Sequence, residues 1–219
     1  MRSYLKALIF DLDGTLADTI PAIAEAVNMT LVSLGYPKRS EEEIRSFIGK
    51  GPRHLIYESM PKDERVFSEK VDKALSLYDV NYAKTYIHTD HTYDGIEDAI
   101  LHLSKYYKLA VLSNKQDQYV KALIDQLFPQ GIFSVVRGTV NGIPAKPEPD
   151  VALEVVKELG AEPHECILIG DSEIDIITAE NAGIDILSVS WGYVSKTKLI
   201  LKGAQDIIGS PSELIEYFD

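Results

Sequence analysis

Short apolar runs alternate with helical patterns over most of this 219-residue chain. Each run has the length of a buried strand and is bounded by turn residues. The runs lie at residues 8–10, 109–112, 133–137, 166–169 and 186–189. Strands that are separated by helices pair in parallel, and a parallel sheet needs helices on both faces. We therefore predict an α/β fold built on a doubly wound parallel sheet.

The stretch between the first two runs is too long for one crossover connection, and its pattern is helical throughout. Ser40 and Glu43 form a capping-box signature at the start of one of its helices. The predicted helices span residues 17–35, 40–48, 53–60 and 61–83. We interpret residues 16–83 as a small α-helical cap domain, inserted into a Rossmann-like core of residues 1–15 and 84–219.

The composition excludes several classes of partner. A formal net charge of −12 argues against nucleic acid or an anionic membrane surface as a partner, because both bind basic proteins.

No apolar run approaches the roughly 20 residues that a membrane span needs, and the first residues lack a signal-peptide pattern. The single cysteine, Cys166, cannot form an internal disulfide and suits a reducing compartment. We expect a cytoplasmic protein.

The first apolar run ends in two aspartates, Asp11 and Asp13, followed by Gly14 and Thr15. Side chains alternate in an extended segment, so both carboxylates can point toward one site. Two like charges at that separation repel, and a bound cation or a shared proton relieves the repulsion. Oxygen ligands without a nearby thiolate favour Mg²⁺. Thr15 can cap the helix that is expected to begin near residue 18.

Polar residues also follow the next three runs. Ser113 and Asn114 follow the second, Lys146 lies in a loop after the third, and Asp171 follows the fourth. The carboxyl ends of neighbouring parallel strands meet at one edge, so we expect a single site there. Lys146 can balance the carboxylates and hold a phosphate oxygen. The Ser113 hydroxyl and the adjacent backbone N–H can cradle phosphoryl oxygens.

A second acidic pair, Asp171 and Asp175, lies at the start of the helix that follows Gly170. The two residues are four apart and therefore share a face of the helix. Taken alone, the pair is equally explained by the favourable position of carboxylates at a helix N-terminus. The ordered set of four motifs, each following its own strand, favours a metal site instead.

These four elements resemble the motifs of the haloacid dehalogenase-like superfamily, and the helical insert resembles that family's small α-helical cap. The resemblance extends over nearly the whole chain and is strongest to phosphoglycolate phosphatase-like and β-phosphoglucomutase-like members. True dehalogenases of the superfamily lack the second aspartate of the first motif. The presence of Asp13 therefore points to phosphoryl transfer.

The resemblance implies a role for each motif residue. Asp11 would be the nucleophile and Asp13 the general acid/base, while Ser113 and Lys146 would complete the catalytic set by binding phosphate. Mg²⁺ would be the cofactor. Its expected ligands are Asp11, Asp13 through the backbone carbonyl, Asp171, and Asp175 directly or through water.

Substrate contacts are expected from Thr15, from Asn114 and from the cap loop that contains Lys50 and Arg53. Two cations in that loop would favour a small phosphate ester with a second anionic group, as in phosphoglycolate. For Trp191, which follows the last run, we favour a role in packing over a role as a wall of the site entrance.

The expected activity is a Mg²⁺-dependent phosphatase that hydrolyses a small phosphate monoester through an aspartyl phosphate. A phosphosugar mutase on the same core is the main alternative, followed by a pyrophosphatase or nucleotidase. A phosphate-binding protein without turnover is more remote. The partner would be a small phosphorylated metabolite, and the protein a monomer or a homodimer.

Overall fold

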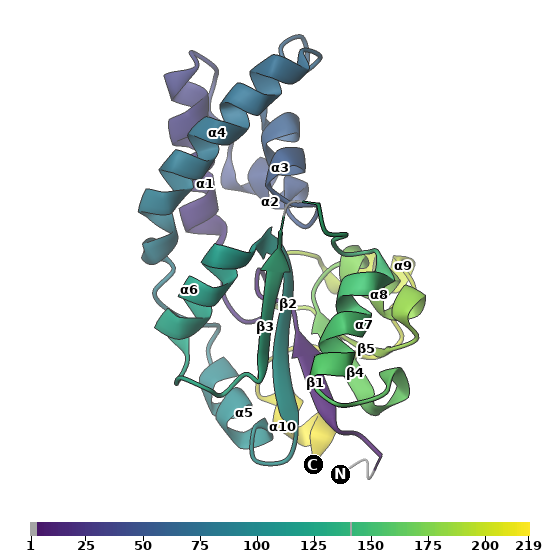
Figure 1. Cartoon of the computed structure of the whole chain (residues 1–219). Helices are drawn as coiled ribbons and strands as arrows, with labels where there is room; N and C mark the ends of the chain where they lie inside the picture. The colour runs from purple at the N-terminus through teal and green to yellow at the C-terminus, as the bar shows by residue number, and fades with distance from the viewer. Residues whose placement is uncertain (1–3, 141) are drawn as a thin grey trace. The chain divides into compact units, whose positions relative to one another are not determined.

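The computed structural model describes residues 4–140 and 142–219. The chain forms two compact units, one of residues 1–18 and 91–219 and the other of residues 19–90. The first unit contains a six-stranded sheet with the order β3-β2-β1-β4-β5-β6, and all of its pairings are parallel. Figure 1 labels β1 to β5 of this sheet. The strands are β1 (Ala7–Phe10), β2 (Lys108–Gln116), β3 (Val135–Thr139), β4 (Cys166–Gly170), β5 (Asp185–Val189) and β6 (Ile207–Ile208).

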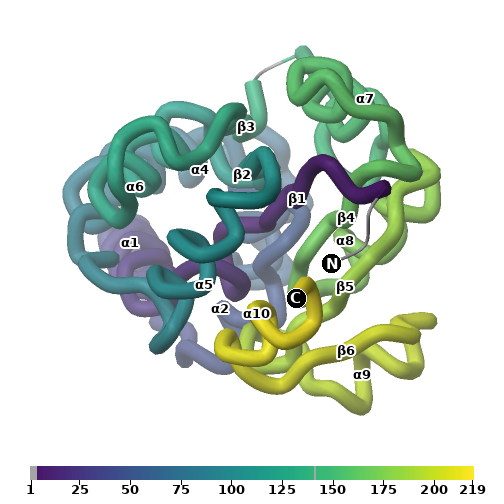
Figure 2. The backbone as a smooth tube through the Cα atoms, turned by 90° about the horizontal axis from the view of Figure 1, so that it is seen from below, coloured from purple at the N-terminus to yellow at the C-terminus, as the bar shows by residue number. Residues whose placement is uncertain are grey.

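Helices cover both faces of this sheet. Figure 2 shows α5 and α6 on one side of the strands and α7 and α8 on the other. The helices of the first unit are α5 (Ile96–Leu103), α6 (Asp117–Leu127), α7 (Pro149–Glu158), α8 (Glu173–Ala182), α9 (Lys196–Leu201) and α10 (Glu213–Phe218), with a 3₁₀ turn η2 (Pro163–Glu165). The doubly wound α/β fold predicted from the alternating runs is confirmed.

The two faces of the sheet follow from the alternation of side chains along β1. Ala7 and Ile9 join the core that α7 and α8 cover. The side chain of Phe10 instead packs edge-on against Phe133, which in turn packs against Phe128 just after α6. All four residues of β1 are completely buried, as expected for a central strand with helices on both sides.

The second unit is helical and follows β1 in the chain. It consists of α1 (Ile20–Ser33), α2 (Glu41–Phe47), α3 (Pro52–Ser59), α4 (Ser68–Thr85) and the 3₁₀ turn η1 (Tyr86–His88). The predicted capping box is present, because the Glu43 N–H donates to the Ser40 hydroxyl and the Ser40 N–H donates to the Glu43 carboxylate. Buried hydrogen bonds join α1 to α4, including one from the Asn81 amide to the Thr30 hydroxyl at 3.0 Å.

Some predicted elements differ from those observed. The helix expected from residue 61 begins only at Ser68, because residues 62–66 form turns. Glu64 stabilises these turns by accepting hydrogen bonds from Tyr36 and Lys70. A sixth strand, β6, and the short helix α9 are additional to the predicted elements. Two strand residues are too few to produce a readable alternation.

Candidate active site

The turn after β1 places the first aspartate pair. The Asp11 N–H donates to the Ile169 carbonyl at 2.9 Å, so Asp11 continues the pairing of β1 with β4 by one residue. The backbone N–H of Leu12 donates to Asp11 Oδ1 at 2.7 Å. The Leu12 carbonyl accepts from three following N–H groups, which closes a tight turn around Gly14, whose φ is +83°. The turn fixes the Asp11 carboxylate at the carboxyl end of the central strand.

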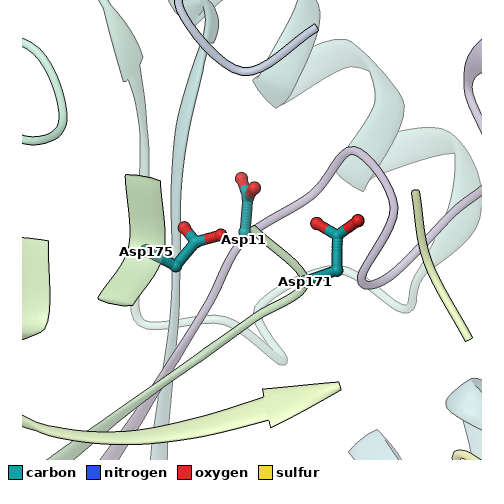
Figure 3. A group of neighbouring side chains, drawn as sticks. All are labelled: Asp11, Asp171 and Asp175. Carbon is teal, nitrogen blue, oxygen red and sulfur yellow. The ribbon is translucent and has the colours of Figure 1, made fainter. Parts of the chain in front are cut away.

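Three carboxylates converge at this edge of the sheet. Oxygens of Asp11, Asp171 and Asp175 lie within 4.8 Å of one another (Figure 3), and all three residues are buried. They come from the ends of β1 and β4 and from the first turn of α8. Because Phe10 pairs with Ile169, the residues after the two strands are neighbours across the sheet. The predicted convergence of Asp11 and Asp171 is therefore what the parallel register produces.

Burial and the repulsion between neighbouring carboxylates disfavour the ionised forms of Asp11 and Asp171. Burial raises the pKa of Asp11 to about 7; Lys146 opposes this rise, and Asp175 and Asp13 add to it. Burial, followed by the charges of Asp175 and Asp11, raises the pKa of Asp171 well above its usual range. Carboxylates that resist ionisation in this way are relieved by a bound cation. Buried oxygen donors of this kind suit a hard divalent ion such as Mg²⁺.

Lys146 is the cation within the cluster. Its Nζ lies 2.6 Å from Asp175 Oδ1 and 3.1 Å from Asp11 Oδ1. Burial alone would lower the pKa of Lys146, but Asp11 and Asp175 outweigh that effect and raise it. One ammonium against three carboxylates leaves two negative charges when all are ionised, which matches the charge of one divalent cation.

Asp175 and Asp171 are held by different donors. Asp175 Oδ2 accepts hydrogen bonds from the Ser172 hydroxyl at 2.6 Å and from the Ser172 N–H at 3.2 Å, so this carboxylate caps α8 while it holds Lys146. Asp171 Oδ2 accepts from the Tyr193 N–H at 2.5 Å. The helix-capping and cluster interpretations of the second acidic pair therefore both apply to Asp175.

Ser113 and Asn114 lie within β2 rather than after it, because the strand continues to Gln116 and pairs there with Thr139. The strand therefore extends two residues beyond Ser113 and Asn114, where the sequence pattern predicts its end. A register shift between Leu112 and Gln116 interrupts the pairing with β3. The Asn114 amide donates to the Lys146 carbonyl at 2.7 Å. Asn114 thus ties β2 to the loop that carries the buried lysine.

Thr15 is fully buried beside the aspartate turn. Its hydroxyl has no hydrogen-bond partner among residues 4–140 and 142–219. The helix cap predicted for Thr15 is wrong, since α1 begins at Ile20 and Thr19 is the residue that precedes it. The Thr15 carbonyl accepts a hydrogen bond from the Trp191 indole at 3.1 Å, which supports the packing role expected for Trp191.

Lys50 and Arg53 belong to the helical unit. Gly49 and Gly51 both have positive φ, as the predicted tight turn requires. Both cationic residues are exposed, and Arg53 pairs with Asp72 of α4 at 2.5 Å. Their contact with a substrate stays a prediction.

Lys115 is absent from the predicted site, yet it contacts one of its aspartates. Its Nζ lies 2.8 Å from Asp13 Oδ1, and the two side chains are 6% and 12% exposed. Strand alternation offers a sequence signal, because residues two apart, such as Ser113 and Lys115, share a face. The backbone N–H of Tyr193, which donates to Asp171, is also absent from the predicted site. A pattern of side chains cannot reveal a backbone donor.

None of the helices in the described part of the chain is long and apolar enough to cross a membrane.

The chain is similar to known proteins over most of its length. The family model described as haloacid dehalogenase-like hydrolase matches residues 8–189. The phosphoglycolate phosphatase of Aquifex aeolicus is 32% identical over 217 residues, which cover 98% of this chain and 97% of that protein. Phosphoglycolate phosphatase 1 of Pseudomonas aeruginosa is 31% identical over 192 residues, or 86% of this chain and 70% of that protein.

Solved structures share the fold over the same extent. A haloacid dehalogenase-like family hydrolase from Streptococcus pneumoniae superposes with a TM-score of 0.88 at 26% identity, and the match covers 99% of this chain and 100% of that one. The agreement includes the helical insertion after β1, since the coverage leaves almost no residue of either chain unmatched.

Proposed function

The chain belongs to the haloacid dehalogenase-like hydrolase family, and from this premise we propose that it is a Mg²⁺-dependent phosphatase of a small phosphate monoester. The observation that carries the proposal is the buried cluster of Asp11, Asp171 and Asp175 around Lys146, with a second aspartate, Asp13, two residues beyond Asp11. A nucleophile, a proton carrier and a charge-balancing group are the parts that phosphoryl transfer requires.

In the first step a carboxylate oxygen of Asp11 forms a bond to phosphorus, and the bond from phosphorus to the ester oxygen breaks. The departing oxygen takes a proton from Asp13, so the product leaves as an alcohol. In the second step Asp13 removes a proton from water, the water oxygen bonds to phosphorus, and the bond to Asp11 breaks. Phosphate is released and both aspartates return to their starting state.

Mg²⁺ is the proposed cofactor, held by Asp11, Asp171 and the backbone carbonyl of Asp13, with Asp175 supporting it. When bound, it would offset the negative charge of the phosphate and of its attacking oxygen. The donor set fits this ion, because three buried carboxylates and one lysine leave the charge that a divalent cation neutralises.

The other predicted residues would hold the phosphate group. Lys146 would contact a phosphoryl oxygen from its place between Asp11 and Asp175. The Ser113 hydroxyl and the Asn114 N–H would hold a second phosphoryl oxygen. The Thr15 hydroxyl would contact the substrate from the turn after β1. These roles would account for the burial of four polar side chains, Thr15, Ser113, Asn114 and Lys146, at one edge of the sheet.

Phosphoglycolate is the substrate we propose. The support comes from two relatives named as phosphoglycolate phosphatases at 31% and 32% identity, and from the exposed cations Lys50 and Arg53, which would attract a second anionic group. A cytoplasmic location and a monomeric or homodimeric state remain predictions.

A screen of phosphate esters with Mg²⁺, read by release of inorganic phosphate, tests the activity. Phosphoglycolate should be hydrolysed faster than sugar phosphates, nucleoside monophosphates and pyrophosphate. Preference for pyrophosphate or a nucleotide would replace the proposed substrate. Turnover that needs a sugar bisphosphate activator and converts one sugar phosphate into its isomer would establish a mutase instead.

Asp11→Asn tests the nucleophile. The variant should lose at least about 10³-fold in kcat, because an amide cannot form the aspartyl phosphate. Asp125→Asn is the matched control, since Asp125 is exposed on α6 and should keep full activity. Substantial turnover by Asp11→Asn, in a preparation free of wild-type enzyme, would refute the assignment.

A further inference from the structure

Two buried lysines contact three of the four aspartates of the site. Lys146 contacts Asp11 and Asp175, as described above. Lys115 contacts Asp13, at 2.8 Å from Oδ1, and this pair is nearly as well shielded from water. A buried lysine is costly unless it is paired, so each lysine has a defined partner. The proposed nucleophile and the proposed proton carrier are therefore held by separate cations.

The backbone of Lys115 is fixed from two sides. Its N–H donates to the Ser113 hydroxyl at 3.3 Å within β2. On the neighbouring strand, Gly138 lies so close that a Cβ there would meet the Lys115 carbonyl oxygen at 2.6 Å. The Gly138 N–H also donates to Asp117 Oδ1 at 3.0 Å, which ties β3 to the end of β2. Lys115 therefore projects from an anchored segment.

Asp13 lies in the turn after β1, and its backbone forms a bridge with Ala17. Proton transfer needs the carboxyl oxygen within about 2.6–3.2 Å of the ester oxygen and later of the water. A charge-assisted hydrogen bond restricts rotation more strongly than a neutral one. Lys115 binds one oxygen of Asp13 at 2.8 Å, so this bond limits the rotation of the whole carboxyl group.

We propose that Lys115 is a positioning residue for the phosphatase reaction, which holds the Asp13 carboxyl group in the orientation that exchanges protons with the leaving oxygen and with water. The inference rests on the proposed function, since it assigns Asp13 the proton transfers of both steps. Lys115 acts through Asp13 and is given no contact with the phosphate.

The test compares Lys115→Met with Lys115→Arg and with Lys121→Met. Methionine keeps much of the side-chain length and removes the ammonium, whereas arginine keeps the charge. Lys121 pairs with Asp117 on the exposed side of α6, so Lys121→Met is a matched loss of one paired lysine outside the site. Thermal unfolding of each variant shows whether it is folded before its rates are compared.

Two esters separate positioning from a merely structural role. The alcohol of phosphoglycolate leaves only with a proton, whereas p-nitrophenolate is a stable anion that leaves without one. Lys115→Met should slow the first turnover of phosphoglycolate about 10- to 100-fold, as a partial loss of general acid catalysis. It should slow the first turnover of p-nitrophenyl phosphate less than about threefold on the same principle.

A second signature concerns the hydrolysis of the intermediate. Because Asp13 must also activate water, Lys115→Met should release about one p-nitrophenolate per enzyme in a burst and then turn over slowly. Lys115→Arg should restore part of the phosphoglycolate rate, and Lys121→Met should behave as wild type. If only Lys115→Arg folds, its first turnover should still be slowed more with phosphoglycolate than with p-nitrophenyl phosphate, by a smaller factor than is expected for Lys115→Met.

Equal losses with the two esters in the first turnover would overturn the proposal, because a distorted site affects both. Unchanged kinetics in folded Lys115→Met would overturn it as well. Failure of the proposed function is separate, since it would appear in the wild-type enzyme as the absence of phosphate release or as activity in Asp11→Asn.

Discussion

The carboxylate of Asp171 occupies space that two glycines leave open. A Cβ at Gly14 would lie 2.4 Å from Asp171 Oδ2, and a Cβ at Gly192 would lie 2.4 Å from the same atom and 2.1 Å from the Gly14 carbonyl oxygen. Contacts this short force the neighbour to move. Both glycines therefore set the position of a proposed metal ligand without contacting the metal.

Gly192→Ala should weaken Mg²⁺ binding. The new methyl group would displace Asp171 and strain its bond to the Tyr193 N–H, and losing the support of a ligand typically costs 10- to 100-fold in affinity. The Mg²⁺ concentration for half-maximal activity measures the effect. Gly209→Ala is the control, because its Cβ would meet only the end of the flexible Glu213 side chain at 3.3 Å. Equal metal dependence in both variants would contradict the assignment.

At the scale of elements, the first turn of α8 performs two tasks with one carboxylate. Asp175 Oδ2 accepts from the Ser172 N–H and hydroxyl, while Oδ1 accepts from Lys146. Gly170 makes the approach possible, because a Cβ there would meet the Asp175 carboxyl carbon at 2.3 Å. The start of the helix is thereby coupled to the lysine of the cluster.

Ser172→Ala and Ser40→Ala compare this coupled cap with an ordinary one. Each variant should lose about 1 kcal/mol of unfolding free energy, as expected for a lost cap, in a chemical denaturation experiment. Only Ser172→Ala should also lower kcat, because Asp175 Oδ2 loses the shorter of its two hydrogen bonds and keeps only the Ser172 N–H, which loosens the hold of Asp175 on Lys146. Ser40 lies in the helical unit, and its hydroxyl forms its cap hydrogen bonds with Glu43, which is not part of the acidic cluster. A loss of activity of the same size in both variants would show that stability, not coupling, is responsible.

At the scale of the whole molecule, the acidic site links metal binding to folding. The pKa of Asp11 is about 7 in the folded chain against 3.8 for a free side chain, and that of Asp171 is raised too. Between about pH 4 and pH 7 these carboxyl groups hold protons in the folded chain that they have released in the unfolded chain, so their contribution to stability without metal falls as pH rises through this range. A cation that binds the ionised carboxylates reverses that loss.

Mg²⁺ should therefore raise the Tm more at pH 7.5 than at pH 5. At the lower pH, protons occupy the carboxylates and compete with the ion. Differential scanning fluorimetry at constant ionic strength, with and without Mg²⁺, measures the difference. In Asp171→Asn the pH-dependent gain should shrink, while Asp125→Asn should keep it. An equal rise in Tm at both pH values would contradict the linkage.

Local patterns were sufficient for much of the fold and for the membership of the acidic cluster. Apolar runs and caps report on burial and backbone preference within a few residues, which is why the central strands and the Ser40 capping box agree with the prediction. The convergence of Asp11 with Asp171 also follows from sequence, because parallel strands with helical crossovers bring their carboxyl ends to one edge.

Other features depend on neighbours that are distant in the chain. Strand β2 continues past Asn114 because Gln116 finds a partner in Thr139, and the pairing of Lys115 with Asp13 depends on β1 and β2 being adjacent. The Tyr193 N–H reaches Asp171 only because β4 and β5 are neighbours. The amino-acid sequence by itself determined the α/β class and the proposed catalytic groups. Only the tertiary structure decided which donor holds each carboxylate, since side-chain partners across a sheet are set by strand order and register.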